Sequence, residues 1–151
     1  MSGWSAPVQV DHTGSGANLY PWLIGGGPDR ADLVWYGGTG VDKDDLTNAW
    51  NVRLSQLNWS RTGLKITADQ MVVSDHAIHH GAICTTGITC SVNGDRTLLD
   101  FFQEAITPDG RAVIAWADDS QAIAAGAAQI YVTIQCAGLN VWNGSKLSST
   151  C

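Results

Sequence analysis

The sequence predicts an all-β fold, and three observations support this. Apolar and polar residues alternate with a period of two along most of the 151-residue chain, which is typical of half-buried strands. Only 15 % of the residues are charged, and 17 are glycine, so strands joined by tight turns are favoured over helices. The length suits one domain with its own core. We therefore expect a single β module over residues 1–151.

Eight stretches are expected to form strands, because each alternates and turn residues separate them. In chain order they are Pro7–Asp11, Tyr20–Gly25, Asp32–Tyr36, Trp50–Leu57, Leu64–Ala68 with Met71–Ser74, Leu99–Thr107, Arg111–Ala117 and Gln129–Gln135. Pro108-Asp-Gly110 is the clearest hairpin turn, since proline presets φ and glycine accepts a positive φ. Two weakly helical stretches, Asp44–Asn48 and Gln121–Ala128, are interpreted as loops.

The chain also repeats part of itself. Arg30 and Trp35 recur as Arg111 and Trp116, both 81 residues later (111 − 30 and 116 − 35), and Val52–Gln56 matches Tyr131–Gln135 at 79 residues (135 − 56). The two tryptophans hold equivalent positions in apolar strands, so we expect both to pack between the repeated units.

This repeat predicts about two four-stranded, propeller-type blades at residues 12–74 and 98–151, separated by an inserted His/Cys loop at residues 75–97. Propeller blades usually recur every ~40–50 residues, and the insertion would account for the longer interval. A chance match within a β-sandwich is the alternative.

The charge balance argues against several partners. The net charge is −6, and the 8 Lys and Arg residues do not cluster, so neither nucleic acid nor an anionic membrane is an expected partner. No stretch approaches the ~20 apolar residues of a membrane span, and no signal peptide is visible.

The four cysteines favour two disulfides over a zinc site, since no Cys-x-x-Cys pair is present. Cys84 and Cys90 flank a short loop and could form one bridge if their Cα atoms approach to about 5.5 Å. Cys136 and Cys151 would form a second bridge that holds the C-terminal tail. Disulfides indicate export to an extracellular or cell-surface location. Export followed by removal of a leader would reconcile the disulfides with the absence of a visible signal peptide, and an incomplete reading frame is the alternative.

Three of the four histidines stand together in the inserted loop. His76, His79 and His80 lie between Asp75 and Asp95, and these five residues are the candidate metal ligands. Imidazole and carboxylate bind zinc, and carboxylates also bind calcium. The His-Glu-x-x-His pattern of zinc proteases is absent. The histidines could instead hydrogen-bond to the backbone of a long loop, or act as acid–base groups.

Two acidic clusters are weaker calcium candidates. Asp42, Asp44 and Asp45 form an acidic loop, and Asp118-Asp119 ends a strand, but neither has the spacing of a calcium-binding loop.

Four further residues are candidates for ligand binding. Arg96 could hold a ligand carboxylate bidentately, or fix the loop through a nearby carboxylate such as Asp100. Trp50 and Trp59 bracket a strand and are expected to be exposed, where an indole can stack on a sugar ring.

The segments Tyr20–Gly38, His76–Cys90, Gly94–Phe102 and Pro108–Asp119 together resemble the C-terminal blades of bacterial exported sialidase-like (BNR-type) β-propeller proteins. The resemblance covers most of the chain and implies a propeller-type fold, export and a carbohydrate ligand. It also implies a mechanism with a Tyr nucleophile, an assisting Glu, an Asp acid–base and three arginines.

The chain departs from that pattern. It has no Phe-Arg-Ile-Pro block and no Ser-x-Asp-x-Gly-x-x-Trp box, and its one glutamate, Glu104, lies in an alternating strand. Catalysis by this chain alone is therefore not expected.

Two blades cannot close a ring, so strand edges and apolar faces would stay uncovered. The leading expectation is a non-catalytic, exported structural module that assembles with itself into an oligomer or filament and binds a glycan. One alternative is a glycoside hydrolase fragment completed by other blades or by partner copies. Another is a metal-dependent enzyme built on the histidine loop.

Overall fold

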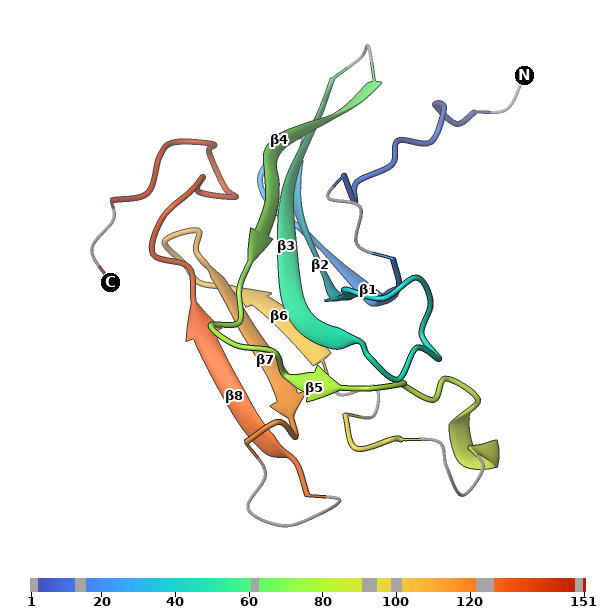
Figure 1. Ribbon diagram of the computed structural model, residues 1–151. Helices are drawn as coiled ribbons and strands as arrows, with labels where there is room; N and C mark the ends of the chain where they lie inside the picture. Colours follow the sequence, from blue (N-terminus) through green and yellow to red (C-terminus); the bar gives the residue numbers. More distant parts are fainter. Residues whose placement is uncertain are drawn as a thin grey trace.

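The structure, a computed structural model, is all-β, as the alternation predicts (Figure 1). It describes residues 3–12, 16–60, 63–90, 95–98, 102–121, 127–148 and 151. Within these ranges the chain forms two antiparallel sheets, of five and three strands, and one turn of 3-10 helix, η1 (Gly87–Thr89).

The first sheet, called sheet 1 below, is a meander in which strands adjacent in sequence are adjacent in space. Its order is β1 (Asn18–Gly25), β2 (Arg30–Gly38), β3 (Ala49–Ser60) and β4 (Gly63–Val72), and the short β5 (His79–His80) pairs with the start of β3. Because the neighbours are antiparallel and close in sequence, short connections suffice to form this sheet.

The second sheet, called sheet 2, contains β6 (Phe102–Ile106), β7 (Ala112–Asp118) and β8 (Gln129–Ile134) in that order. The predicted hairpin turn joins β6 to β7. The Gly110 amide donates to the Thr107 carbonyl at 2.9 Å, and Gly110 has a φ of +83°, which explains why glycine stands there.

One strand prediction is wrong, and another is confirmed with an irregular register. Pro7–Asp11 is not a strand and belongs to neither sheet, because alternation alone does not place a segment beside a sheet edge. Leu64–Ala68 with Met71–Ser74, predicted as one interrupted strand, corresponds mainly to β4, whose register shifts on either side of its pairing with Gln56. Residues 99–101 of another predicted strand lie outside the described residues.

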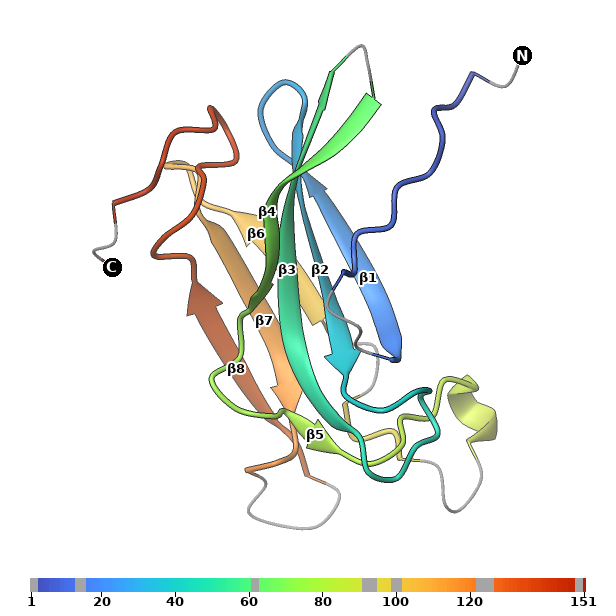
Figure 2. The ribbon, with the colours of Figure 1, turned by 45° about the horizontal axis from the view of Figure 1, so that its top comes forward.

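The core lies between the two sheets, which pack face to face as two layers (Figure 2). Sheet 1 contributes alternate residues of β2 and β3, sheet 2 contributes alternate residues of β6 and β7, and the loops after β5 and before β6 close one end. The main members are Val34, Tyr36, Trp50, Val52, Leu54, Ile78, Ile83, Leu98, Phe102, Ile114 and Trp116.

The strand registers refine the internal repeat. Trp35 pairs with Arg53 in sheet 1, and Trp116 pairs with Tyr131 in sheet 2. If the two tryptophans are equivalent, their partners Arg53 and Tyr131 are equivalent as well. The offset between β3 and β8 is then 78 residues (131 − 53), whereas the sequence match gives an offset of 79. A one-residue difference moves every side chain of a strand to the other face, so the register decides which faces are equivalent.

The expected packing of the tryptophans between the units holds for Trp116 but not for Trp35. Trp116 belongs to the core between the sheets. Trp35 lies between two core residues of β2, so its side chain is on the face of sheet 1 that points away from sheet 2, where its indole N–H donates to Asn18 Oδ1 at 2.8 Å. Both side chains thus extend from their own sheet in the direction that leads from sheet 2 to sheet 1, as expected if the two sheets are repeated layers.

Both predicted disulfides are present. Cys84 and Cys90 are bonded, with their Cα atoms 6.0 Å apart, and Cys136 and Cys151 are bonded, with their Cα atoms 5.1 Å apart. The first bridge lies in the loop after β5, and the second joins the segment after β8 to the last residue. Two disulfides fit a protein that folds in an oxidising environment.

Candidate functional site

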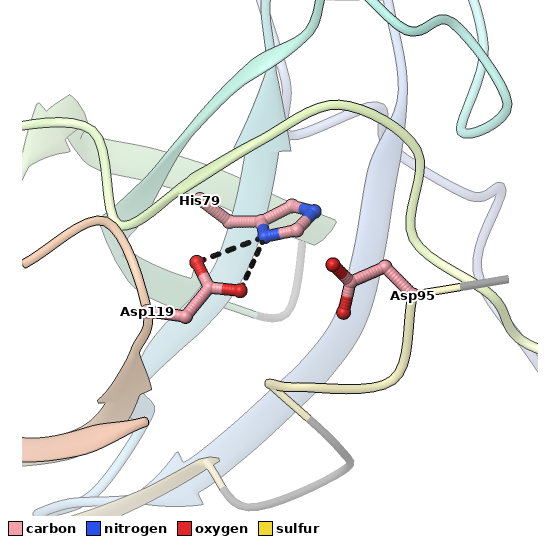
Figure 3. Close-up of side chains that lie close together, drawn as sticks. All are labelled: His79, Asp95 and Asp119. Atoms are coloured by element: carbon pink, nitrogen blue, oxygen red, sulfur yellow. Dashed lines mark hydrogen bonds and ion pairs between the residues drawn. The ribbon is translucent and has the colours of Figure 1, made fainter. Parts of the chain in front are cut away.

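A buried histidine and two aspartates meet at one end of the sheets (Figure 3). His79, Asp95 and Asp119 each offer a ligand atom, and these atoms all lie within 4.8 Å of one another. His79 Nδ1 is 2.9 Å from each carboxylate oxygen of Asp119. The side chain of His79 is only 3 % exposed, and that of Asp119 is 13 % exposed. This group could hold a metal ion.

Strand pairing positions His79. It stands opposite Trp50 in the β3–β5 ladder, and the preceding Ile78 amide donates to the Trp50 carbonyl at 2.7 Å. The Ile78 carbonyl in turn accepts from the amides of Asp119 and Ser120, at 3.1 and 3.3 Å. The backbone therefore fixes the end of β7 directly beside β5.

Asp95 reaches the group from the loop that carries the first disulfide. The Cys84 amide donates to the Asp95 carbonyl at 2.8 Å, and the Thr97 amide donates to Asp95 Oδ1 at 2.7 Å. Asp95 itself is exposed. Because one oxygen is occupied by Thr97, the other is the one available to a ligand.

Opposing effects act on the pKa of His79. Burial lowers it, but the hydrogen bond to Asp119 and the negative charges of Asp119 and Asp95 outweigh burial and raise the pKa above its usual value. The site therefore favours a positive charge at this position.

A second histidine lies nearby in a different pair of contacts. His76 Nδ1 is 2.6 Å from Asp75 Oδ1, and His76 Nε2 is 2.7 Å from Asp118 Oδ2. The hydrogen bond to Asp75 is the main reason why the pKa of His76 is raised, and Asp118 adds to it. His76 also meets the ring of Tyr131 edge-on, with the ring centroids 5.7 Å apart.

The predicted ligand set is thus divided by the structure. His79 and Asp95 come together, His76 and Asp75 form a separate pair, and His80 is exposed and outside the three-residue group. Asp119 completes the group, although the sequence suggested it only as part of an acidic pair. Its contribution depends on contact with Ile78, 41 residues away in sequence (119 − 78), which no local pattern reveals.

The other ligand-binding predictions have mixed outcomes. The expectation that Trp50 is exposed is wrong: it is 0 % exposed, and its indole N–H donates to the Gly81 carbonyl at 2.8 Å. Trp59 is 38 % exposed, as expected. Arg96 is half-buried next to Asp95, and Asp100 lies outside the described residues.

Two buried carboxyl groups inside the core were missed by the sequence analysis. Asp32 and Glu104 lie between the sheets, 0 and 3 % exposed. Burial raises the pKa of Glu104 to about 9, with a contribution from the charge of Asp32, and burial raises the pKa of Asp32 to about 6 against the hydrogen bond from Gln56. The signal was available: Glu104 alternates with Phe102 and so shares its inward face.

The outer face of sheet 2 is apolar and exposed. Ile130, Val132 and Ile134 alternate along β8 and are 67, 64 and 42 % exposed. Two of their partners in β7, Ala115 and Val113, are half-buried and lie on the same face, whereas the third, Ala117, is 3 % exposed and belongs to the core. The face thus continues across two strands.

A comparison of the chain with protein-family models, with curated proteins and with solved structures found no match. In the described ranges, no helix is long and apolar enough to cross a membrane.

Proposed function

We propose that this chain is a non-catalytic, exported structural module whose copies stack sheet on sheet. The observation that carries the proposal is the outer face of sheet 2, where Ile130, Val132 and Ile134 are 67, 64 and 42 % exposed. Sheets with one face in water normally alternate apolar and polar residues, whereas β8 is apolar on its outer side. Such a face is typical of an interaction surface.

The internal repeat indicates what covers this face. By the register given above, Val34 and Leu54 of sheet 1 correspond to Ala115 and Val132 of sheet 2. Val34 and Leu54 pack against the inner face of sheet 2 within the same chain. By analogy, Ala115 and Val132 are expected to pack against a sheet of another copy whose surface resembles that inner face. The matching surface is the opposite face of sheet 1, which carries Trp35.

That surface is partly open. Leu23 and Leu33 pair on the face that carries Trp35, and Leu23 is 60 % exposed. Leu33 and Trp35 also line a groove of about 200 Å³, together with Val10 of the N-terminal segment. A second copy could therefore seat its sheet 2 here, in a head-to-tail arrangement that forms a ring or a filament.

The three exposed side chains of β8 set the scale of the interaction. Burying what remains exposed of them is worth roughly 3–5 kcal/mol, at 1.5–3 kcal/mol for each fully buried side chain. Association costs about 4–15 kcal/mol in lost freedom of motion, so these residues alone do not hold two copies together. We expect assembly at micromolar or higher concentration, with contributions from both entire faces.

The test uses light scattering on the oxidised protein and two charge variants. Val132→Glu alters the outer face of sheet 2, and Leu23→Glu alters the outer face of sheet 1. Each variant alone should be monomeric, at 16.0 kDa. Mixed together they retain one intact interface and should form dimers only. Val41→Glu is the matched control, because Val41 is 85 % exposed in a loop, and it should assemble like the unchanged chain.

A monomeric unchanged chain at several hundred micromolar would contradict the proposal. Assembly that Val132→Glu removes but Leu23→Glu leaves intact would show that two copies pair through sheet 2 alone, which contradicts the head-to-tail arrangement.

The remaining parts of the proposal have separate support. The two disulfides support export. A glycan ligand rests on the resemblance to sialidase-like propellers and on the exposure of Trp59. The glycoside-hydrolase alternative rests on that resemblance alone.

A further inference from the structure

We propose that His79, Asp95 and Asp119 bind one divalent transition-metal ion of the zinc type. This site is independent of the sheet faces proposed for assembly. Its three ligands come from three separate segments: β5, the disulfide loop, and the end of β7. Figure 3 shows the three side chains directed toward a common point.

The distances suit a small ion. Nitrogen and oxygen ligands bind zinc at about 2.0–2.2 Å, so two ligands of a tetrahedral site lie roughly 3.4 Å apart. His79 Nδ1 and the Asp119 oxygens are now 2.9 Å apart, and the ligand atoms of the group are within 4.8 Å of one another. Movements of about 1 Å would therefore complete the site, and the exposed Asp95 side chain has room to make them.

Two of the three ligands are already held in place. The Ile78 carbonyl accepts from the Asp119 amide at 3.1 Å, and the Ile78 amide is bound to β3. His79 Nε2 is 3.4 Å from the Ala82 carbonyl, which leaves Nδ1 directed at Asp119. Ligands fixed in this way lose little freedom when an ion binds, and an oriented second ring nitrogen is typical of metal-binding histidines.

The charge around the site also favours a cation. Four carboxylates, Asp75, Asp95, Asp118 and Asp119, gather around two histidines here. In the described part of the chain, no Lys or Arg forms an ion pair with any of the four. A divalent ion would balance the two carboxylates that bind it.

The ligand types select the metal. Calcium and magnesium prefer oxygen ligands only, whereas the nearly buried imidazole of His79 suits zinc and its neighbours. Three protein ligands leave a fourth position for water, as in zinc sites that are open to a further ligand. Without an ion, the same residues form a His79–Asp119 ion pair that joins β5 to β7, and the experiment separates the two states.

The test is calorimetric titration of Zn²⁺ into chelator-treated protein with both disulfides intact, so that no thiol competes. We expect one equivalent, a Kd of about 1 μM or lower, and no displacement by millimolar Ca²⁺. The Tm should rise by roughly 5–10 °C when free Zn²⁺ is a hundredfold above Kd. Co²⁺ in place of Zn²⁺ should give the intense visible absorption of a tetrahedral site.

Variants identify the ligands. Asp95→Asn should weaken Zn²⁺ binding at least tenfold, and it should fold normally, because Asp95 is exposed and asparagine keeps an oxygen for Thr97. His79→Gln should abolish binding. His80→Gln is the matched control, one residue away and exposed, and it should bind like the unchanged chain.

Three results would overturn the proposal. They are the absence of stoichiometric Zn²⁺ binding, equal affinity in Asp95→Asn and the unchanged chain, and a loss of binding in His80→Gln.

Discussion

Glu104 provides the sharpest test of the core. It is 3 % exposed between the sheets, and among the described residues neither carboxylate oxygen has a hydrogen-bond partner. Burial and the nearby Asp32 raise the pKa of Glu104 to about 9. The folded chain therefore keeps this carboxyl group protonated at neutral pH, whereas the unfolded chain ionises it near 4.5.

The protonated Glu104 makes the free energy of unfolding depend on pH. Between pH 4.5 and about 9 the folded state binds one more proton than the unfolded state, so the free energy of unfolding falls as the pH rises. Each pH unit in this window costs about 1.36 kcal/mol. From pH 6.5 to 8.5 the expected loss is about 2.5 kcal/mol. Asp32, with a pKa of about 6, has largely completed its own titration below this window.

The assay compares the chain with Glu104→Gln, which resembles the protonated form, by urea unfolding at pH 6.5, 7.5 and 8.5. His76 and His79, whose pKa values are raised, also lose stabilising interactions as the pH rises, so only the difference between the two proteins is interpreted. The variant should gain about 2.5 kcal/mol relative to the unchanged chain across the window. Asp109→Asn, at an exposed carboxylate whose pKa is lowered, should keep the unchanged slope. Parallel slopes for the unchanged chain and Glu104→Gln would refute the buried protonated carboxyl.

Two other predictions concern Trp50 of β3 and the Cys84–Cys90 disulfide. Trp50→Phe leaves the Gly81 carbonyl without its donor and opens a cavity at a fully buried position, so urea unfolding should show a loss of about 2–4 kcal/mol; a loss below 1 kcal/mol would mean that the indole is not anchored there. Replacing Cys84 and Cys90 by serine should accelerate hydrogen exchange at the amide of residue 84, which donates to the Asp95 carbonyl, before it affects the β2–β3 ladder, because no described side chain between the two cysteines belongs to the core. Mass spectrometry that shows equal protection with and without the bridge would contradict this prediction.

Much of the fold was predictable because it depends on local patterns. The alternation located β2, β3, β7 and β8, and the Pro108-Asp-Gly110 turn located the β6–β7 hairpin. The N-terminal segment failed for the opposite reason: Pro7–Asp11 alternates, but pairing requires a free strand edge, which alternation does not reveal. The two-residue β5 is too short for any periodicity.

The site was predictable only in part. Histidine and cysteine density drew attention to the loop that contains His79 and Asp95, two of the three residues that the structure brings together. Asp119 could not be assigned, because it is brought to His79 by backbone hydrogen bonds to Ile78 across the fold. Trp50 was misplaced for a similar reason, since its burial depends on Gly81 and on the loop that covers it.

The register of β8 shows why the repeat seen in the sequence did not predict the exposed outer face of sheet 2. Sequence similarity aligned Leu54 with Thr133, at 79 residues, and Thr133 pairs with Ile114 on the inner face of sheet 2. The ladder instead aligns Leu54 with Val132, which is 64 % exposed on the outer face. Because side chains alternate between faces, that single residue converts an apparent core position into an uncovered one. The case for assembly therefore depends on the pairing of Trp116 with Tyr131, and the Val132→Glu variant tests that register as directly as it tests the interface.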